Sequence, residues 1–173
     1  TPWSRLQYMN RKTEHQRQRL EELQEKHRGI TGFVKKVAAR RRRHSQHFLT
    51  EQPWSASSQK LPEIKDAVRD CDEGFLNMCM HNLRCPETGS LLKKDTWVAA
   101  TSRNALENIC IECDGSHLHK TINGSVRVPG EPKRVPLSEY AGGYTREFDI
   151  AMISGFEKDL PEHCVLPSRE VQI

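Results

Sequence analysis

Three short apolar segments alternate with helical or turn-forming stretches, and this alternation constrains the fold more than any other feature of the chain. The segments are predicted to be buried strands near residues 47–51, 74–80 and 96–101. Between the first two, residues 61–69 are predicted to form a short helix that is entered through Pro62. Strands that alternate with helices in this way indicate an α/β fold, in which helices cover a sheet.

A long polar segment, residues 5–43, precedes the first strand. It is predicted as a helix because apolar side chains recur in it at helical spacing. These side chains are Leu6, Met9, Leu20, Leu23, Ile30, Val34 and Val37. Gly29 and Gly32 interrupt the stripe, so the segment can also form two helices. Charges of both signs surround the stripe, which is typical of a solvated helix that packs on a sheet.

The long helix is predicted to end in four arginines, Arg40, Arg41, Arg42 and Arg43. Such a run can bind nucleic-acid phosphates, favour the dipole at a helix C-terminus, or act as a nuclear localisation signal. The net charge of +4 is compatible with a polyanionic partner but does not require one. No apolar run approaches the roughly 20 residues of a membrane span. We therefore expect an intracellular protein, with the nucleus as one possible compartment.

The second half of the chain contains cysteines and histidines at spacings that suit a metal site. Cys110 and Cys113 form a Cys-x-x-Cys pair, and His117 and His119 follow closely. Two thiolates and two imidazoles can complete a tetrahedron around zinc. Two earlier cysteines are possible further ligands: Cys79 and Cys85. The alternative is a buried cysteine pair beside exposed histidines.

Two other uses of the cysteines are less well supported. The chain has six cysteines, but it shows no secretory signal that would favour disulfides. Residues 113–117 spell the name of the CDGSH iron–sulfur proteins. That family needs an upstream Cys-x-Cys pair, and Ser102 and Asn104 stand at those positions here. We therefore expect reduced thiols or a zinc site, and no iron–sulfur cluster.

Glu51 ends the first predicted strand and is followed by Gln52 and Pro53. In open α/β sheets, ligands bind at the ends of strands. A carboxylate in this position can form hydrogen bonds with the Watson–Crick edge of a flipped base. The alternative is a structural carboxylate that pairs with the arginine run.

Three segments resemble DNA (cytosine-5) methyltransferases, and they occur in the same order. Residues 1–7 resemble the segment that follows the catalytic Pro-Cys of that family. Residues 48–53 resemble its Glu-Asn-Val or Glu-Asn-Pro strand, and residues 93–99 resemble its Gln-x-Arg-x-Arg strand. Over about residues 1–155, the chain is similar to methyltransferase-like regions of copia-type retroelement polyproteins. Those regions share the Phe-Leu-x-Glu-x-Pro, Lys-Lys-x-Thr and Cys-x-Gly-x-His-x-His motifs.

The resemblance implies a doubly wound α/β domain that binds DNA and uses S-adenosylmethionine. It implies that Glu51 holds the N3 side of cytosine while a cysteine attacks C6. It also assigns substrate or phosphate contacts to Ser4, Lys93 and Lys94. The nucleophilic cysteine and the cofactor-binding strand of the family would precede Thr1. We therefore expect a piece of a larger domain, which needs the missing N-terminal half as its partner and is inactive alone.

The expected organisation has three parts. Residues 1–108 form a partial methyltransferase-like α/β region, residues 109–155 a loop-rich Cys/His segment with a short helix, and residues 156–173 a tail. Two other functions are compatible with the sequence. One is a zinc-stabilised nucleic-acid-binding module, which depends on the arginine run and the Cys/His cluster. The other is a structural subunit of a ribonucleoprotein assembly, which suits a long basic helix and a proline-rich tail.

Overall fold

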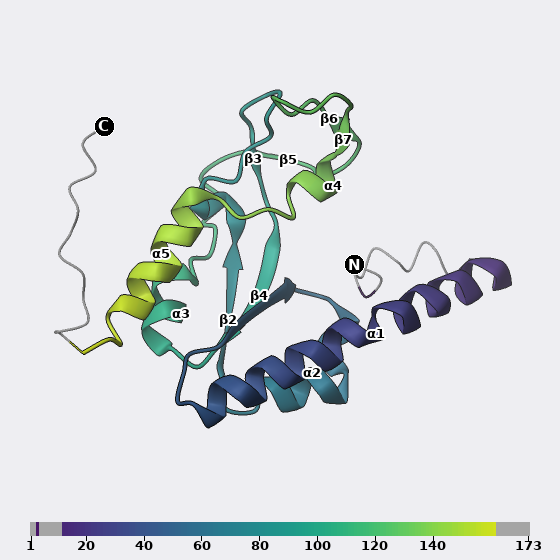
Figure 1. Cartoon of the computed structure of the whole chain (residues 1–173). Coiled ribbons are helices and arrows are strands. Elements are labelled where there is room, and N and C mark those ends of the chain that lie inside the picture. The colour runs from purple at the N-terminus through teal and green to yellow at the C-terminus, as the bar shows by residue number, and fades with distance from the viewer. Residues whose placement is uncertain (1–2, 4–11, 162–173) are drawn as a thin grey trace.

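A sheet of three strands lies at the centre of the fold (Figure 1). The computed structural model describes residue 3 and residues 12–161. The strands are β1 (Leu49–Pro53), β2 (Asp72–Asn77) and β4 (Asp95–Ala100), and their order in the sheet is β1-β4-β2. The central strand β4 is antiparallel to both neighbours, so β1 and β2 are parallel to each other.

The connection from β1 to β2 is a helical crossover, which parallel strands require. It consists of the 3-10 helix η2 (Ser57–Lys60) and the helix α2 (Pro62–Ala67). Pro62 is in the first turn of α2. The backbone N–H groups of a first turn have no partner within the helix, so a proline there costs no helical hydrogen bond. The later strand β4 then enters between β1 and β2.

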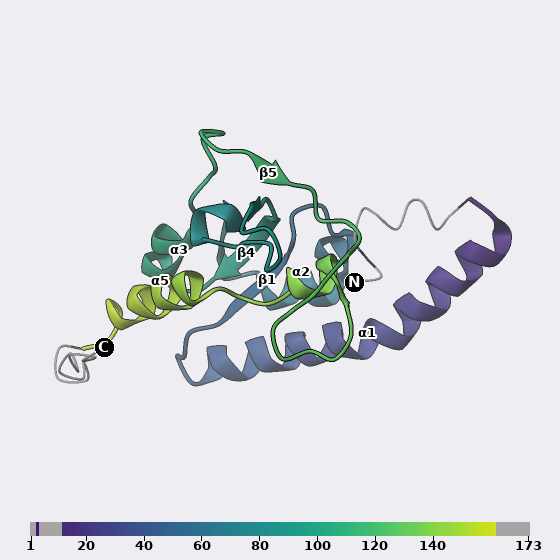
Figure 2. The same ribbon diagram turned by 90° about the horizontal axis from the view of Figure 1, so that it is seen from above.

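Helices cover both faces of the sheet (Figures 1 and 2). On one face, α1 (Glu14–Arg43) and α2 pack against Trp97 and Ala99 of β4. On the other face, α3 (Arg103–Ile109) and α5 (Arg146–Glu157) pack against Val98 and Ala100. The alternation of these four residues is the two-residue period of a strand that is buried on both faces. At this coarse level, the prediction of an α/β fold is confirmed.

The long N-terminal helix is continuous through Gly29 and Gly32, so the alternative of two helices is wrong. It begins at Glu14 because Thr13 and Gln16 form a capping box, in which each side chain bonds to the backbone of the other. The N-terminal half of α1 extends past the sheet (Figures 1 and 2). The part of the prediction that covers residues 5–11 lies outside the described residues.

Two predicted elements end differently in the structure. The second strand ends at Asn77, and residues 78–80, which were predicted to continue it, belong instead to the 3-10 helix η3 (Met78–His81). The short helix predicted within residues 109–155 is divided into α4 (Leu137–Tyr140) and α5, with Gly142 and Gly143 between them. Within the part of the chain that the structure describes, no helix is both long and apolar enough to span a membrane.

The Cys/His segment contributes short strands to two small sheets. It also shares the main core, which covers the face of the central sheet that carries Val98 and Ala100. Parallel strands β3 (Leu91–Leu92) and β5 (His119–Lys120) form one two-stranded sheet, and antiparallel β6 (Ser125–Val126) and β7 (Val135–Pro136) form another. Three buried residues of this half belong to the core that covers one face of the central sheet: Val126, Leu137 and Phe148. The loop-rich half is therefore packed against the α/β half.

Asp159, just after α5, fastens that helix to the start of α3. The Ser102 hydroxyl and the Asn104 amide both donate hydrogen bonds to its carboxylate, the latter at 2.7 Å. His47 Nε2 lies 3.5 Å from the same carboxylate. The Ser102 bond, the Asn104 bond and the nearby His47 hold the pKa of Asp159 below its ordinary value.

We expect Asp159→Asn to destabilise the protein by about 1–2 kcal/mol at pH 7, because a charged acceptor is lost. The folded-state pKa of Asp159 is lowered, so its contribution is fully present above the unfolded pKa of about 3.9 and is lost as pH falls through the folded pKa. Urea unfolding of the wild type and the variant at pH 7 and about pH 3 measures this. A difference that stays constant at acidic pH would contradict the assignment.

Candidate metal centre and carboxylate cluster

Four sulfur- and nitrogen-bearing side chains meet between η3 and β5. They are those of Cys79, Cys113, His117 and His119, and their ligand atoms all lie within 4.8 Å of one another. Cys113 Sγ is 3.6 Å from the Nε2 atoms of both histidines. Cys79 is buried and the other three are half-buried. A group of this size and chemistry could hold one metal ion.

Local hydrogen bonds explain why Cys113 faces the cluster. The Cys113 N–H donates to Asn77 Oδ1 at 2.7 Å, and the Asn77 amide donates to Asp95 Oδ1 at 2.6 Å. These hydrogen bonds attach the loop that contains Cys113 to the end of β2 and the start of β4. Gly115 has φ of 76°, a left-handed conformation that favours glycine and turns the chain back toward His117 and His119.

The thiol of Cys79 is in an environment that disfavours its charged form. Burial raises the pKa of Cys79 to about 11, and the adjacent Cys113 thiol adds to the rise through a hydrogen bond and charge repulsion. A nearby cation would act in the opposite direction, because it stabilises thiolates.

The predicted ligand Cys110 is not part of this cluster, and the structure places Cys79 there instead. Cys110 caps the C-terminus of α3 and packs against the main core. Its Sγ lies against Gly74 of β2, where an added Cβ would come within 2.2 Å of the sulfur. Cys110 and Cys113 are close in the sequence, but Cys110 directly follows the end of α3, and its side chain is directed toward β2 and away from the cluster. Cys85, the other earlier candidate, is buried outside the cluster.

A second cluster forms around Glu51 on β1. Glu51 is paired with Val98 of β4, and it lies on the face of β1 that carries Leu49 toward the main core. Its Oε1 is 3.9 Å from Lys94 Nζ, and only 18% of the Glu51 side chain and 16% of the Lys94 side chain are exposed. The ammonium of Lys94 is also 5.9 Å from the ring centroid of Tyr144.

The carboxylate of Glu51 retains unused hydrogen-bonding capacity. Its Oε2 atom is buried and has no hydrogen-bond partner among the described residues. Burial raises the pKa of Tyr144 above its ordinary value, and the charge of Glu51 and a hydrogen bond with its carboxylate raise it further. A buried acceptor without a donor is costly, and a ligand that donates a hydrogen bond would relieve that cost.

No family model, curated protein or solved structure matches this chain. The two clusters are therefore interpreted from their own geometry and chemistry. Glu51 and Lys94 were both predicted as site residues, and the fold brings them together. Tyr144 was not predicted as a site residue, because it reaches the cluster from the loop before α5, far along the chain from both partners.

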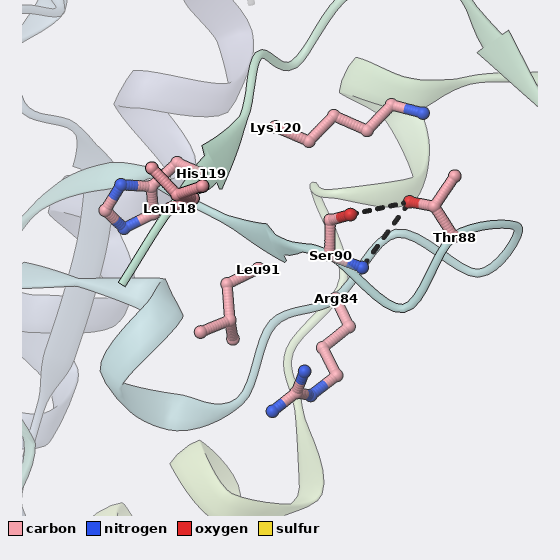
Figure 3. Close-up of a pocket in the computed structure, with 7 residues that line it drawn as sticks. All are labelled: Arg84, Thr88, Ser90, Leu91, Leu118, His119 and Lys120. Atoms are coloured by element: carbon pink, nitrogen blue, oxygen red, sulfur yellow. Dashed lines mark hydrogen bonds between the residues drawn. The ribbon is translucent and has the colours of Figure 1, made fainter. Parts of the chain in front are cut away.

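Lysines line a cavity of about 610 Å³ beside the second cluster. Lys93 and Lys94 connect β3 to β4, and Lys120 comes from β5 together with His119 of the Cys/His cluster. Figure 3 shows that His119 and Lys120 leave β5 in opposite directions, and that Lys120 extends above a turn in which Thr88 and Ser90 are hydrogen-bonded. That turn and Lys120 line a neighbouring pocket of about 390 Å³.

Two arginines of the run, Arg41 and Arg42, form contacts within the protein. Arg42 forms an ion pair with Asp70 and donates to the Asp66 and Ala67 carbonyl oxygens, which fastens α1 to the end of α2. Arg41 donates to Gln46 at 2.9 Å. Arg40 and Arg43 are exposed, and the run as a whole ends α1. Ser4, a predicted substrate contact, lies outside the described residues.

Proposed function

We propose that this chain is part of a DNA cytosine-5 methyltransferase-like domain of a retroelement-type polyprotein, in which Glu51 binds the target cytosine. One observation carries the proposal. Glu51 and Lys94 come from two separate segments that resemble this family, and Oε1 of Glu51 on β1 lies 3.9 Å from Nζ of Lys94, which directly precedes β4. The resemblance was drawn from linear motifs, so this contact is independent support for it.

The chemistry of the Glu51 cluster suits recognition of a base. The free Oε2 of Glu51 can accept a hydrogen bond from the Watson–Crick edge of a flipped cytosine. Lys94 Nζ can donate to a carbonyl or phosphate oxygen at the same place, and Lys93 can contact the DNA backbone from the rim of the adjoining cavity. In this proposal, the attacking cysteine and the S-adenosylmethionine site belong to the rest of the domain.

The sheet is compatible with a larger doubly wound domain. Such domains often carry an antiparallel strand near one edge of an otherwise parallel sheet. Here, β4 is antiparallel between the parallel strands β1 and β2. Among the described residues, no strand pairs with the outer edge of β1. Another parallel strand added at that edge would extend the sheet and cover an exposed row of backbone groups.

We expect Glu51→Gln to lower kcat/KM for cytosine methylation by about 10²–10⁴-fold in the polypeptide that includes the upstream Pro-Cys segment. The amide keeps the shape of the side chain but loses the charge that would assist attack at C6. Transfer of labelled methyl groups from S-adenosylmethionine to duplex DNA measures the rate. The chain of 173 residues alone is expected to transfer none.

Glu139→Gln is the matched control, because Glu139 is an exposed glutamate on α4 and should leave the rate unchanged. Two results would refute the proposal. One is a Glu51→Gln rate equal to that of the control. The other is a transcript in which no Pro-Cys codons precede the Thr1 codon.

A further inference from the structure

We infer that Cys79, Cys113, His117 and His119 bind a single zinc ion, which holds the Cys/His segment onto the end of the central sheet. This inference goes beyond the proposed function, because it does not depend on DNA binding or methyl transfer. It also replaces the ligand set that the Cys-x-x-Cys spacing predicts, since Cys79 takes the place of Cys110.

Two edges of the cluster match those of a tetrahedral zinc site, and all four ligand atoms lie within 4.8 Å of one another. Zinc lies about 2.3 Å from a thiolate sulfur and about 2.0–2.1 Å from an imidazole nitrogen, so tetrahedral angles place sulfur about 3.5 Å from nitrogen. Cys113 Sγ is 3.6 Å from Nε2 of His117 and 3.6 Å from Nε2 of His119. Both sulfur–nitrogen distances therefore agree with tetrahedral zinc coordination.

Hydrogen bonds to sulfur hold these side chains together only weakly. The Cys113 thiol can donate to one imidazole and accept from the N–H of the other, so both 3.6 Å contacts can be hydrogen bonds, but weak ones. The Cys79 thiol, close to the same sulfur, adds a further weak donor and a further weak acceptor. A cation at the centre would satisfy all four ligand atoms at once.

The donor set selects the metal. Two sulfur and two nitrogen ligands in a tetrahedron favour zinc, whereas calcium and magnesium require oxygen ligands. The group contains no carboxylate. Four protein ligands leave no open coordination position for water or substrate, which is typical of a structural zinc site. The ion is therefore assigned to holding the fold together.

The structural effect of the ion follows from where its ligands lie. Cys79 is in η3, directly after β2, while the other ligands lie in the loop after α3 and at the start of β5. Strands β3 and β5 contribute only two residues each to their sheet, too few to hold β5 in place alone. The ion would fix β5, and with it Lys120 in the wall of the lysine-lined cavity.

The first test is the zinc content and zinc affinity of the full chain. One zinc per chain is expected in the purified protein. Cys113→Ser should weaken binding at least about 100-fold, because the loss of an outer-shell partner already costs 10–100-fold. Cys110→Ser is the matched control from the same Cys-x-x-Cys pair, and it should keep the wild-type affinity in competition with a chromogenic chelator. Equal losses in the two variants would overturn the ligand set.

Two further measurements remain informative if a cysteine variant fails to fold. Cobalt bound to the wild-type chain should give the intense visible bands of tetrahedral coordination and a charge-transfer band from thiolate ligands. An octahedral spectrum, or no stoichiometric binding, would overturn the inference. Chelation of zinc from the wild type should increase amide exchange across residues 113–121 while β4 stays protected. Unchanged exchange in that segment would also overturn it.

Discussion

Phe148→Ala is expected to lower the free energy of unfolding by about 3–5 kcal/mol, the range for a large aromatic side chain removed from a core. Phe148 lies in the first turn of α5 and is 1% exposed within the core that covers one face of the central sheet. Its ring packs edge-on against His81 at 5.3 Å and is stacked with Tyr144 at 5.0 Å. Denaturant-induced unfolding, followed by circular dichroism, measures the loss.

The same helix provides matched controls for Phe148→Ala. Ile150 and Ile153 are both 52% exposed on α5, so their replacement by alanine should change stability by less than about 0.5 kcal/mol. Phe148→Leu should recover much of the lost stability, because leucine fills part of the same space. If Phe148→Ala costs no more than Ile150→Ala, the packing of α5 on the sheet is not as described.

Phe148 also connects the core to the Glu51 cluster. Thr145 caps α5 by accepting a hydrogen bond from the Phe148 N–H, and its hydroxyl donates to the His81 carbonyl oxygen at 2.6 Å. The cap and the stacked ring together hold Tyr144 beside Lys94. Loss of the Phe148 ring should therefore loosen the cluster as well as the core.

The local pattern of the sequence was sufficient to predict the layers of the fold. The strand β4 is buried on both faces, and strands of this kind can be predicted because they are nearly continuous apolar runs in the sequence. The polar helix predicted over residues 5–43 was found over Glu14–Arg43, because its apolar stripe extends over many turns, although the sequence also allowed two helices. The order of the strands was not predictable in this way. The position of β4 between β1 and β2 depends on contacts between segments that are far apart in the chain.

The short helix α3 was not predicted, and Cys79 was predicted only as a possible further ligand beside Cys110, for the same physical reason. α3 has only seven residues, and its stability comes from the Ser102 cap and from packing against α5. The end of α3 directs Cys110 toward β2, while η3 presents Cys79 to the cluster. Cysteine spacing identifies nearby thiols but not which of them face a common point. The contact of Glu51 with Lys94 likewise depends on the pairing of β1 with β4, which brings the residue before β4 close to β1.

Gly155→Ala and Gly29→Ala are expected to change stability in opposite directions, although both glycines lie inside helices. A Cβ at Gly155 would lie 2.4 Å from Ala105 Cα and 2.8 Å from Asn104 O, which are backbone atoms of α3 that a rotamer change cannot move. The helices would have to separate, so Gly155→Ala should cost about 1–3 kcal/mol or more. The close approach of α3 and α5 therefore requires glycine at this position.

Gly29 supplies the comparison, because a Cβ there meets no atom within 4 Å. Gly29→Ala should stabilise α1 by about 0.5–1 kcal/mol, since alanine loses less backbone entropy than glycine on forming a helix. Urea unfolding of both variants gives the two signs directly. A neutral Gly155→Ala would mean that α3 and α5 are farther apart than described.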